Sequence, residues 1–188
     1  TTVTGIDTAG KRSPDGSLRE LQNAREIAEK VVSELKKRGF DAERIVTEEN
    51  DISLSERCRR VNSICDRVGT KNVIFVSIHC NAAGNGSQWM NARGWEAWTS
   101  VGQTAADKMA DCLYKAQRNR LQIRKDTTEA DPDKEAFVYL ETHEMPAVLT
   151  ENLFQDNKED VAFLLSEAGK ETIVCLHVKG IINYLKTI

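Results

Sequence analysis

The stretch Asn72-Val73-Ile74-Phe75-Val76-Ser77-Ile78 is an almost continuous apolar run that ends directly before His79. A run of this length predicts a central strand buried on both faces of a sheet. A second run, Pro146-Ala147-Val148-Leu149-Thr150, ends in the same way before Glu151. We therefore expect two buried strands, each followed by a side chain that is capable of acid-base or metal chemistry.

Outward from these runs, helical and extended patterns alternate. Amphipathic helices are predicted over 21–35 and 54–68, each followed by a glycine, and strands over 40–47, 94–99, 137–140 and 145–151. Further helices are predicted over 104–117, 158–166 and 170–185. This alternation implies one α/β domain over residues 1–188, with a central, mostly parallel or mixed sheet and helices on both faces.

Two segments have the form of a capping box, Ser17-Leu18-Arg19-Glu20 and Ser53-Leu54-Ser55-Glu56. In this motif the serine accepts a hydrogen bond from the helix backbone, and the glutamate reaches back to the serine N–H. On spacing alone, Glu20 is therefore interpreted as a capping residue.

The composition excludes several classes of protein. The chain has 188 residues and is 40% hydrophobic and 29% charged, as is ordinary for a globular protein. Its net charge is only -3, so it does not have the excess of basic residues that is typical of a nucleic-acid binder. No apolar run approaches the roughly 20 residues that span a bilayer, and Thr1-Thr2-Val3-Thr4 does not resemble a signal peptide. We expect a monomeric globular domain without a membrane span or a nucleic-acid partner.

The chain has five cysteines and no CxxC pair, so we interpret them as buried structural thiols rather than a disulfide framework or a redox centre.

Ligands of open α/β sheets collect at the carboxyl ends of the strands, which makes His79 and Glu151 the first candidates for a site. A lone histidine at a strand end is more often structural than a ligand. A carboxylate beside a buried strand, however, costs desolvation energy unless it is paired, bound to metal or protonated. Glu151 is therefore the stronger indication of a site, and His177, inside the last predicted helix, is interpreted as structural.

An ordered series of motifs resembles that of the zinc-dependent N-acetylmuramoyl-L-alanine amidases. The motifs are Gly5-Ile6-Asp7-Thr8-Ala9-Gly10-Lys11-Arg12-Ser13-Pro14, Arg19-Glu20, Phe75-Val76-Ser77-Ile78-His79-Cys80-Asn81-Ala82, Gly94-Trp95-Glu96-Ala97-Trp98 and Pro146-Ala147-Val148-Leu149-Thr150-Glu151-Asn152.

The resemblance implies that residues 1–188 form an amidase catalytic domain in which Glu20 and His79 bind Zn²⁺ and Glu151 is the catalytic carboxylate. It also implies a peptidoglycan substrate, cleaved between N-acetylmuramic acid and L-alanine, and action in the bacterial cell envelope or outside the cell. Both a phage lysin and a host autolysin fit this description. Trp89, Trp95 and Trp98 would either pack against sugar or belong to the core.

The chain departs from the family at Thr4, where the family has a histidine as its third zinc ligand. A hydroxyl is a poor zinc ligand, so a metal-deficient, wall-binding relative without activity is an alternative. His143 is a further candidate for the third ligand. A zinc hydrolase that acts on another amide or peptide is the remaining interpretation.

Overall fold

The computed structural model describes residues 11–48, 52–117, 120–124, 133–134 and 145–188. Within these residues a four-stranded sheet has the order β1-β4-β2-β3. β1 is parallel to β4, β2 is antiparallel to β4, and β3 is parallel to β2, so the sheet is mixed as predicted. The strands are β1 (Phe75–Asn81), β2 (Trp95–Thr99), β3 (Asp133–Lys134) and β4 (Ala147–Phe154).

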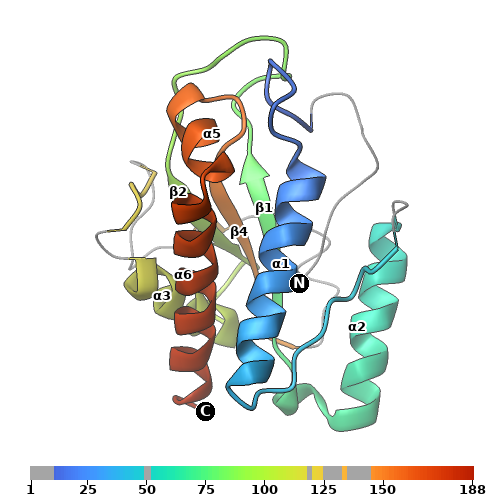
Figure 1. Cartoon of the computed structure of the whole chain (residues 1–188). Helices are drawn as coiled ribbons and strands as arrows, with labels where there is room; N and C mark the ends of the chain where they lie inside the picture. Colours follow the sequence, from blue (N-terminus) through green and yellow to red (C-terminus); the bar gives the residue numbers. More distant parts are fainter. Residues whose placement is uncertain (1–10, 49–51, 118–119, 125–132, 135–144) are drawn as a thin grey trace.

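Helices cover both faces of the sheet, as expected (Figure 1). On one face, α1, α3, α5 and α6 pack in a large hydrophobic cluster against β1, β2 and β4. On the other face, α2 forms a smaller cluster with the first half of β1 and the beginning of β4. The helices are α1 (Glu20–Lys37), α2 (Leu54–Val68), α3 (Ala105–Gln117), α5 (Lys158–Leu165) and α6 (Glu167–Leu185), with a short 3-10 turn η1 (Thr70–Asn72) before β1.

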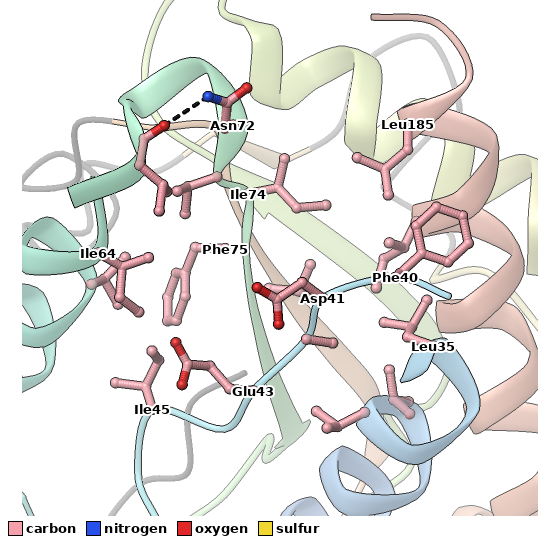
Figure 2. A pocket seen from close by; sticks show the side chains of 18 of the residues that line it. Leu35, Phe40, Asp41, Glu43, Ile45, Ile64, Asn72, Ile74, Phe75 and Leu185 are labelled. Atoms are coloured by element: carbon pink, nitrogen blue, oxygen red, sulfur yellow. Dashed lines mark hydrogen bonds between the residues drawn. The ribbon is translucent and has the colours of Figure 1, made fainter. Parts of the chain in front are cut away.

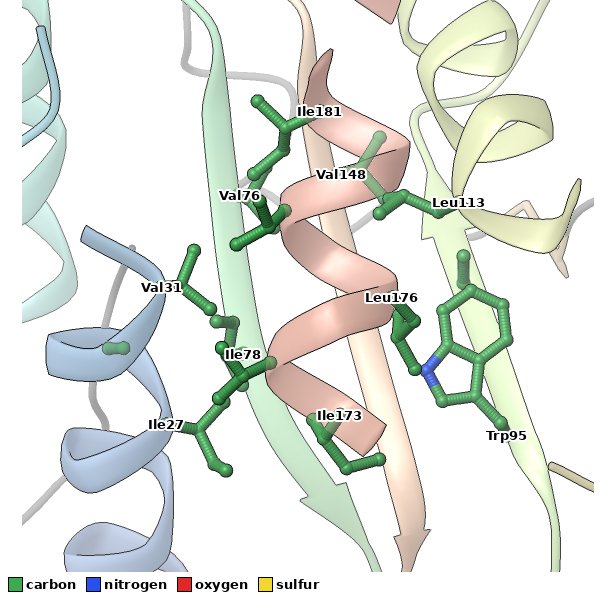
Figure 3. Packing of buried hydrophobic residues seen from close by; sticks show 14 of the residues in the cluster. Ile27, Val31, Val76, Ile78, Trp95, Leu113, Val148, Ile173, Leu176 and Ile181 are labelled. Carbon is green, nitrogen blue, oxygen red and sulfur yellow. The ribbon is translucent and has the colours of Figure 1, made fainter. Parts of the chain in front are cut away.

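Alternation along β1 divides its side chains between these two clusters. Val76 and Ile78 point into the large cluster, where they meet α1 and α6 (Figure 3). Phe75 belongs to the smaller cluster under α2. Because successive side chains of a strand point to opposite faces, His79 shares the face of Phe75. The polar end of β1 therefore lies on the face that α2 covers near the strand's beginning.

β1 is buried on both faces, as predicted, but it is not a central strand among the described residues. In the described part of the chain it is the last strand in the sheet order, and β4 takes the interior position. Helices on both faces bury β1, so a continuous apolar run does not require a strand neighbour on each side. β4 extends to Phe154, and Glu151 consequently lies within the strand rather than after it.

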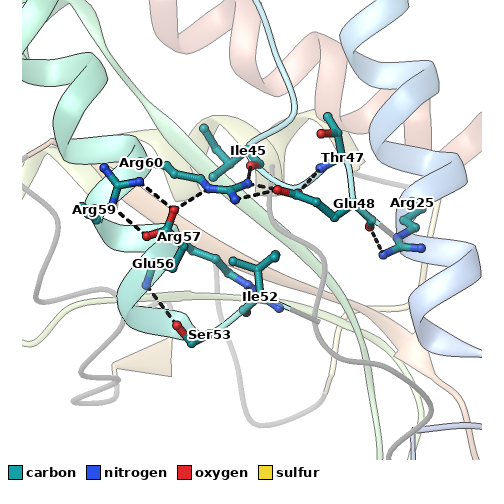
Figure 4. A network of polar contacts seen from close by, with 10 residues as sticks. All are labelled: Arg25, Ile45, Thr47, Glu48, Ile52, Ser53, Glu56, Arg57, Arg59 and Arg60. Carbon is teal, nitrogen blue, oxygen red and sulfur yellow. Dashed lines mark hydrogen bonds and ion pairs between the residues drawn. The ribbon is translucent and has the colours of Figure 1, made fainter. Parts of the chain in front are cut away.

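The strand predicted over 40–47 is wrong: these residues have no strand partner among the described residues. Arginine side chains bind the backbone of this connection (Figure 4). Arg60 Nη1 donates to the Ile45 carbonyl over 2.9 Å, and Arg25 Nη2 donates to the Glu48 carbonyl over 2.5 Å. Apolar residues of the segment pack on the core, and the Ile45 carbonyl and the Phe40 N–H bind groups of α2 and α1 rather than a strand.

The two predicted capping boxes have different outcomes. Ser53 caps α2 by accepting a hydrogen bond from the Glu56 N–H, as predicted. The box at Ser17 is wrong, because α1 begins at Glu20 with Arg19 as N-cap, and Ser17 instead donates to Asp15. Glu20 is thereby the first residue of the helix, and its carboxylate is available for another partner.

The remaining helices agree with the prediction, and the strand predicted over 137–140 lies outside the described residues. All five cysteines are free, as expected, but Cys65 and Cys80 alone are fully buried.

Candidate active site

Three ionisable side chains form a row across the sheet. His79 of β1 is the register partner of Glu151 of β4, and Glu151 is the register partner of Glu96 of β2. Register partners on neighbouring strands project from the same face, side by side. Glu151 therefore stands between an imidazole and a second carboxylate.

Glu20 reaches this row from the beginning of α1, which lies at the carboxyl end of β1 (Figure 1). Its Oε1 atom is 2.9 Å from His79 Nδ1 and 3.4 Å from the Cys80 N–H, and its Oε2 atom is 3.4 Å from Lys11 Nζ. Burial by itself raises the pKa of Glu20, but the hydrogen bond and charge of His79 and the Lys11 ammonium outweigh it. They hold the pKa below its ordinary value. Glu20 is therefore a buried, ionised carboxylate in contact with an imidazole.

Glu151 has the opposite environment. Its Oε2 atom is buried and has no hydrogen-bond partner among the described residues. Burial raises the pKa of Glu151 well above its ordinary value, and the negative charges of Glu20 and Glu96 raise it further. Two carboxylates whose pKa values are pushed apart by their surroundings are suited to different roles in acid-base chemistry.

Glu96, which was not predicted as a site residue, joins the row from β2. It is fully buried and accepts hydrogen bonds from Asn81 Nδ2 at 2.5 Å, Trp98 Nε1 at 3.2 Å and Arg124 Nη1 at 2.9 Å. The available signal was one charged residue inside an otherwise apolar strand, which indicates a paired or functional group.

Two polar residues of β4 hold the neighbouring backbone in place. Asn152 Nδ2 donates to the His79 carbonyl over 3.0 Å, which fixes the end of β1. Thr150 Oγ1 lies 2.9 Å from His177 Nε2, and His177 Nδ1 lies 2.8 Å from the Ile173 carbonyl. Burial lowers the pKa of His177 to about 4, so the ring is neutral and donates to Ile173 through Nδ1. The structural interpretation of His177 is confirmed.

Asp156 holds the loop that follows β1. Its Oδ2 atom accepts the N–H groups of Ala83 and Gly84 over 2.9 and 2.7 Å, and its backbone carbonyl accepts the Met90 N–H over 2.7 Å. This loop is thereby joined to the turn between β4 and α5.

The tryptophans have separate environments. Trp95 is completely buried and packs edge-on against Tyr114 with ring centroids 4.9 Å apart, so it belongs to the core. Trp98 donates to Glu96, and the ring of Trp89 lies 5.7 Å from Lys158 Nζ.

No group of three or more metal-binding side chains occurs in the described ranges, where Glu20 and His79 form a pair. Thr4 and His143, the two positions considered for a third ligand, lie outside those ranges. A cavity of about 450 Å³ lies at the opposite end of β1, near Phe75 and Leu185, and is lined mainly by apolar side chains (Figure 2). It is separate from the site.

The fold and the row of side chains together define an α/β protein with an acid-base cluster at the carboxyl end of parallel strands. The sequence profile described as N-acetylmuramoyl-L-alanine amidase matches residues 4–183, so the chain belongs to that family. An endolysin of Bacillus phage SPP1 is 30% identical over 177 residues, which are 89% of this chain and 59% of the endolysin. The chain thus spans about three fifths of that relative's length.

Solved structures share the fold. The catalytic domain of CwlV, an N-acetylmuramoyl-L-alanine amidase from Bacillus (Paenibacillus) polymyxa var. colistinus, superposes with a TM-score of 0.79 at 21% identity, covering 98% of this chain and 95% of that one. An N-acetylmuramoyl-L-alanine amidase from Clostridium difficile 630 gives a TM-score of 0.78 at 25% identity, with coverages of 98% and 93%. None of the described helices is long and apolar enough to cross a bilayer.

Proposed function

We propose that residues 1–188 form a catalytic domain that hydrolyses the amide bond between N-acetylmuramic acid and L-alanine in peptidoglycan, with Zn²⁺ as cofactor. The observation that carries the proposal is the convergence of Glu20, His79 and Glu151 on one end of the sheet, although the three residues are far apart in the chain. Family membership and the names of the similar proteins support the same substrate. The domain would act on the bacterial cell wall, from the envelope or from outside the cell.

Glu20 and His79 have the chemistry of zinc ligands. Zinc prefers nitrogen and oxygen donors of this kind, and a catalytic site combines three protein ligands with one open position. Glu20 Oε2 is buried, forms an ion pair with Lys11 Nζ at 3.4 Å and has no hydrogen-bond partner among the described residues, so its one contact is already with a cation. The chain's own contribution to the metal is therefore this pair together with a third ligand, for which Thr4 and His143 are the positions to test.

Bound zinc would polarise the amide carbonyl and make a neighbouring water more acidic. The role of Glu151 follows from its environment: the raised pKa makes its ionised form a stronger base than an ordinary carboxylate, and its Oε2 atom has no hydrogen-bond donor among the described residues, so we assign it as the proton acceptor beside the metal ligands. It would take the proton of the attacking water and return it to the departing alanine nitrogen. Ser77 Oγ, 2.8 Å from His79 Nε2, would orient the ring so that Nδ1 faces Glu20, the carboxylate with which His79 would hold the metal.

The test is product analysis with purified peptidoglycan. Zinc-loaded protein should release stem peptides with a new L-alanine amino terminus and leave the glycan strands uncut, and a chelator should stop the release. Wall binding without release would favour the metal-deficient relative. Cleavage of other amides, with peptidoglycan left intact, would favour a different zinc hydrolase.

A further inference from the structure

Glu96 presents an electrostatic problem that the proposed mechanism does not explain. It is a fully buried carboxylate in the middle of β2, next to the second carboxylate, Glu151. Neighbouring buried charges of the same sign repel strongly, and a buried charge is stable only when it is paired and hydrogen-bonded. The position of Glu96 must therefore depend on a counter-charge.

Arg124 supplies that charge from the segment that follows α3. Its Nη1 atom lies 2.9 Å from Glu96 Oε2 and 3.1 Å from Oε1, so one nitrogen bridges both carboxylate oxygens. The backbone places the arginine: the Trp95 N–H donates to the Gln122 carbonyl over 2.8 Å, and the Arg124 N–H donates to the Trp95 carbonyl over 3.1 Å. Arg124 is thus attached to β2 independently of its side chain.

Gly94 makes this close approach possible. It has a φ of +121°, and a Cβ added to it would lie 2.7 Å from the Arg124 backbone nitrogen. Such a contact would push the segment away from β2, so the local sequence is adapted to keep the arginine beside Glu96.

On its other side Glu96 holds the end of β1. Asn81, two residues after His79, donates to Glu96 Oε1 over 2.5 Å, and the Asn81 carbonyl accepts the Gln155 N–H over 2.8 Å. The carboxylate of β2 thus reaches across β4 to β1, with Glu151 between them. Displacement of Glu96 would release Asn81 and remove the lateral neighbour of Glu151.

We propose that Arg124 is a positioning residue: its ion pair with Glu96 fixes the row in which Glu151 stands, and so supports turnover without touching the substrate. This inference rests on the proposed amidase function. A misplacement of about 1 Å in such a site can cost on the order of a hundredfold in rate.

The experiment compares Arg124→Met with wild type in the zinc-loaded protein, well below the unfolding temperature. We expect kcat per folded, zinc-loaded molecule to fall about 10- to 100-fold with little change in KM. The double variant Glu96→Gln/Arg124→Met should recover much of the loss, because the buried charge is removed together with its partner and the glutamine oxygen can still accept from Asn81.

Arg93→Met is the matched control. Arg93 is 36% exposed and pairs with the buried Asp160 over 3.3 Å. Arg124 is 35% exposed and pairs with the buried Glu96 in the same way, but Arg93 lies outside the row. The Arg93→Met variant should have a lower unfolding temperature than wild type and an unchanged kcat. The inference is overturned if Arg124→Met has wild-type kcat, if it loses no more kcat than Arg93→Met, or if the double variant recovers nothing. An inactive wild type would instead contradict the proposed function.

Discussion

His79 Nδ1 lies 2.9 Å from Glu20 Oε1, although 59 residues separate the two in the chain. The contact joins the carboxyl end of β1 to the beginning of α1, and β4 places Glu151 beside it. The fold thus brings one imidazole and two carboxylates that are distant in the sequence into one compact group. The pKa of Glu20 is lowered and the pKa of Glu151 is raised.

If this pair binds the metal, removing either partner should release zinc. We expect Glu20→Gln and His79→Ala each to lower zinc affinity by at least about 100-fold, more than the loss of a residue that only supports a ligand. Elemental analysis after dialysis against a chelator measures the effect. Glu26→Gln, on the same helix but bound to Lys30 and Lys170 at the surface, is the control and should retain zinc. Full zinc content in both test variants would place the metal elsewhere.

The packing of α3 on α6 predicts a large cost for Leu113→Ala. Leu113 is completely buried, and the two helices are already so close that a Cβ on Gly180 would lie 2.9 Å from the Leu113 Cα. The helices cannot close further on the cavity, so we expect a loss of about 2–5 kcal/mol in the free energy of unfolding. Urea unfolding measures it, with the exposed Lys108→Ala on the same helix as control. A loss below about 1 kcal/mol would show that this interface relaxes.

His177 should make stability depend on pH. Its pKa is about 4 in the folded protein against 6.5 as the ordinary value, so the unfolded chain takes up a proton first as the pH falls. The contribution to stability is therefore complete above pH 6.5 and is lost progressively down to about pH 4, by on the order of 3 kcal/mol.

The measurement for His177 is unfolding of zinc-free protein between those two pH values. We expect His177→Gln to have a smaller change of stability with pH than wild type. Parallel curves for the two proteins would contradict the assignment of a neutral, buried ring.

The helices and strands that have a regular pattern of apolar residues could be predicted from the sequence. The helical spacing of α1 and the apolar runs of β1 and β4 identified these elements. The polar residues near the carboxyl ends of these strands, His79 and Glu151, identified part of the candidate site. The resemblance to the amidase family added the proposed role of Glu20 as a metal ligand, where local spacing indicated only a capping residue; the structure places Glu20 beside His79.

Features that depend on tertiary contacts could not be predicted in this way. The segment 40–47 has strand-like composition, but it forms no strand, and the side chain of Arg60 binds its Ile45 carbonyl. Glu96 and Arg124 are 28 residues apart on different elements, and no local pattern relates them. The relation of their ion pair to the site could be recognised only from the sheet register, which places Glu96 beside Glu151.

The most direct test of the central claim is the zinc content and turnover of Glu151→Gln on peptidoglycan, measured on the same preparation. We expect the variant to hold as much zinc as wild type and to lose turnover by about 10²- to 10⁴-fold, because the amide cannot accept a proton. Wild-type turnover in a zinc-loaded Glu151→Gln protein would contradict the role of Glu151 as the proton acceptor.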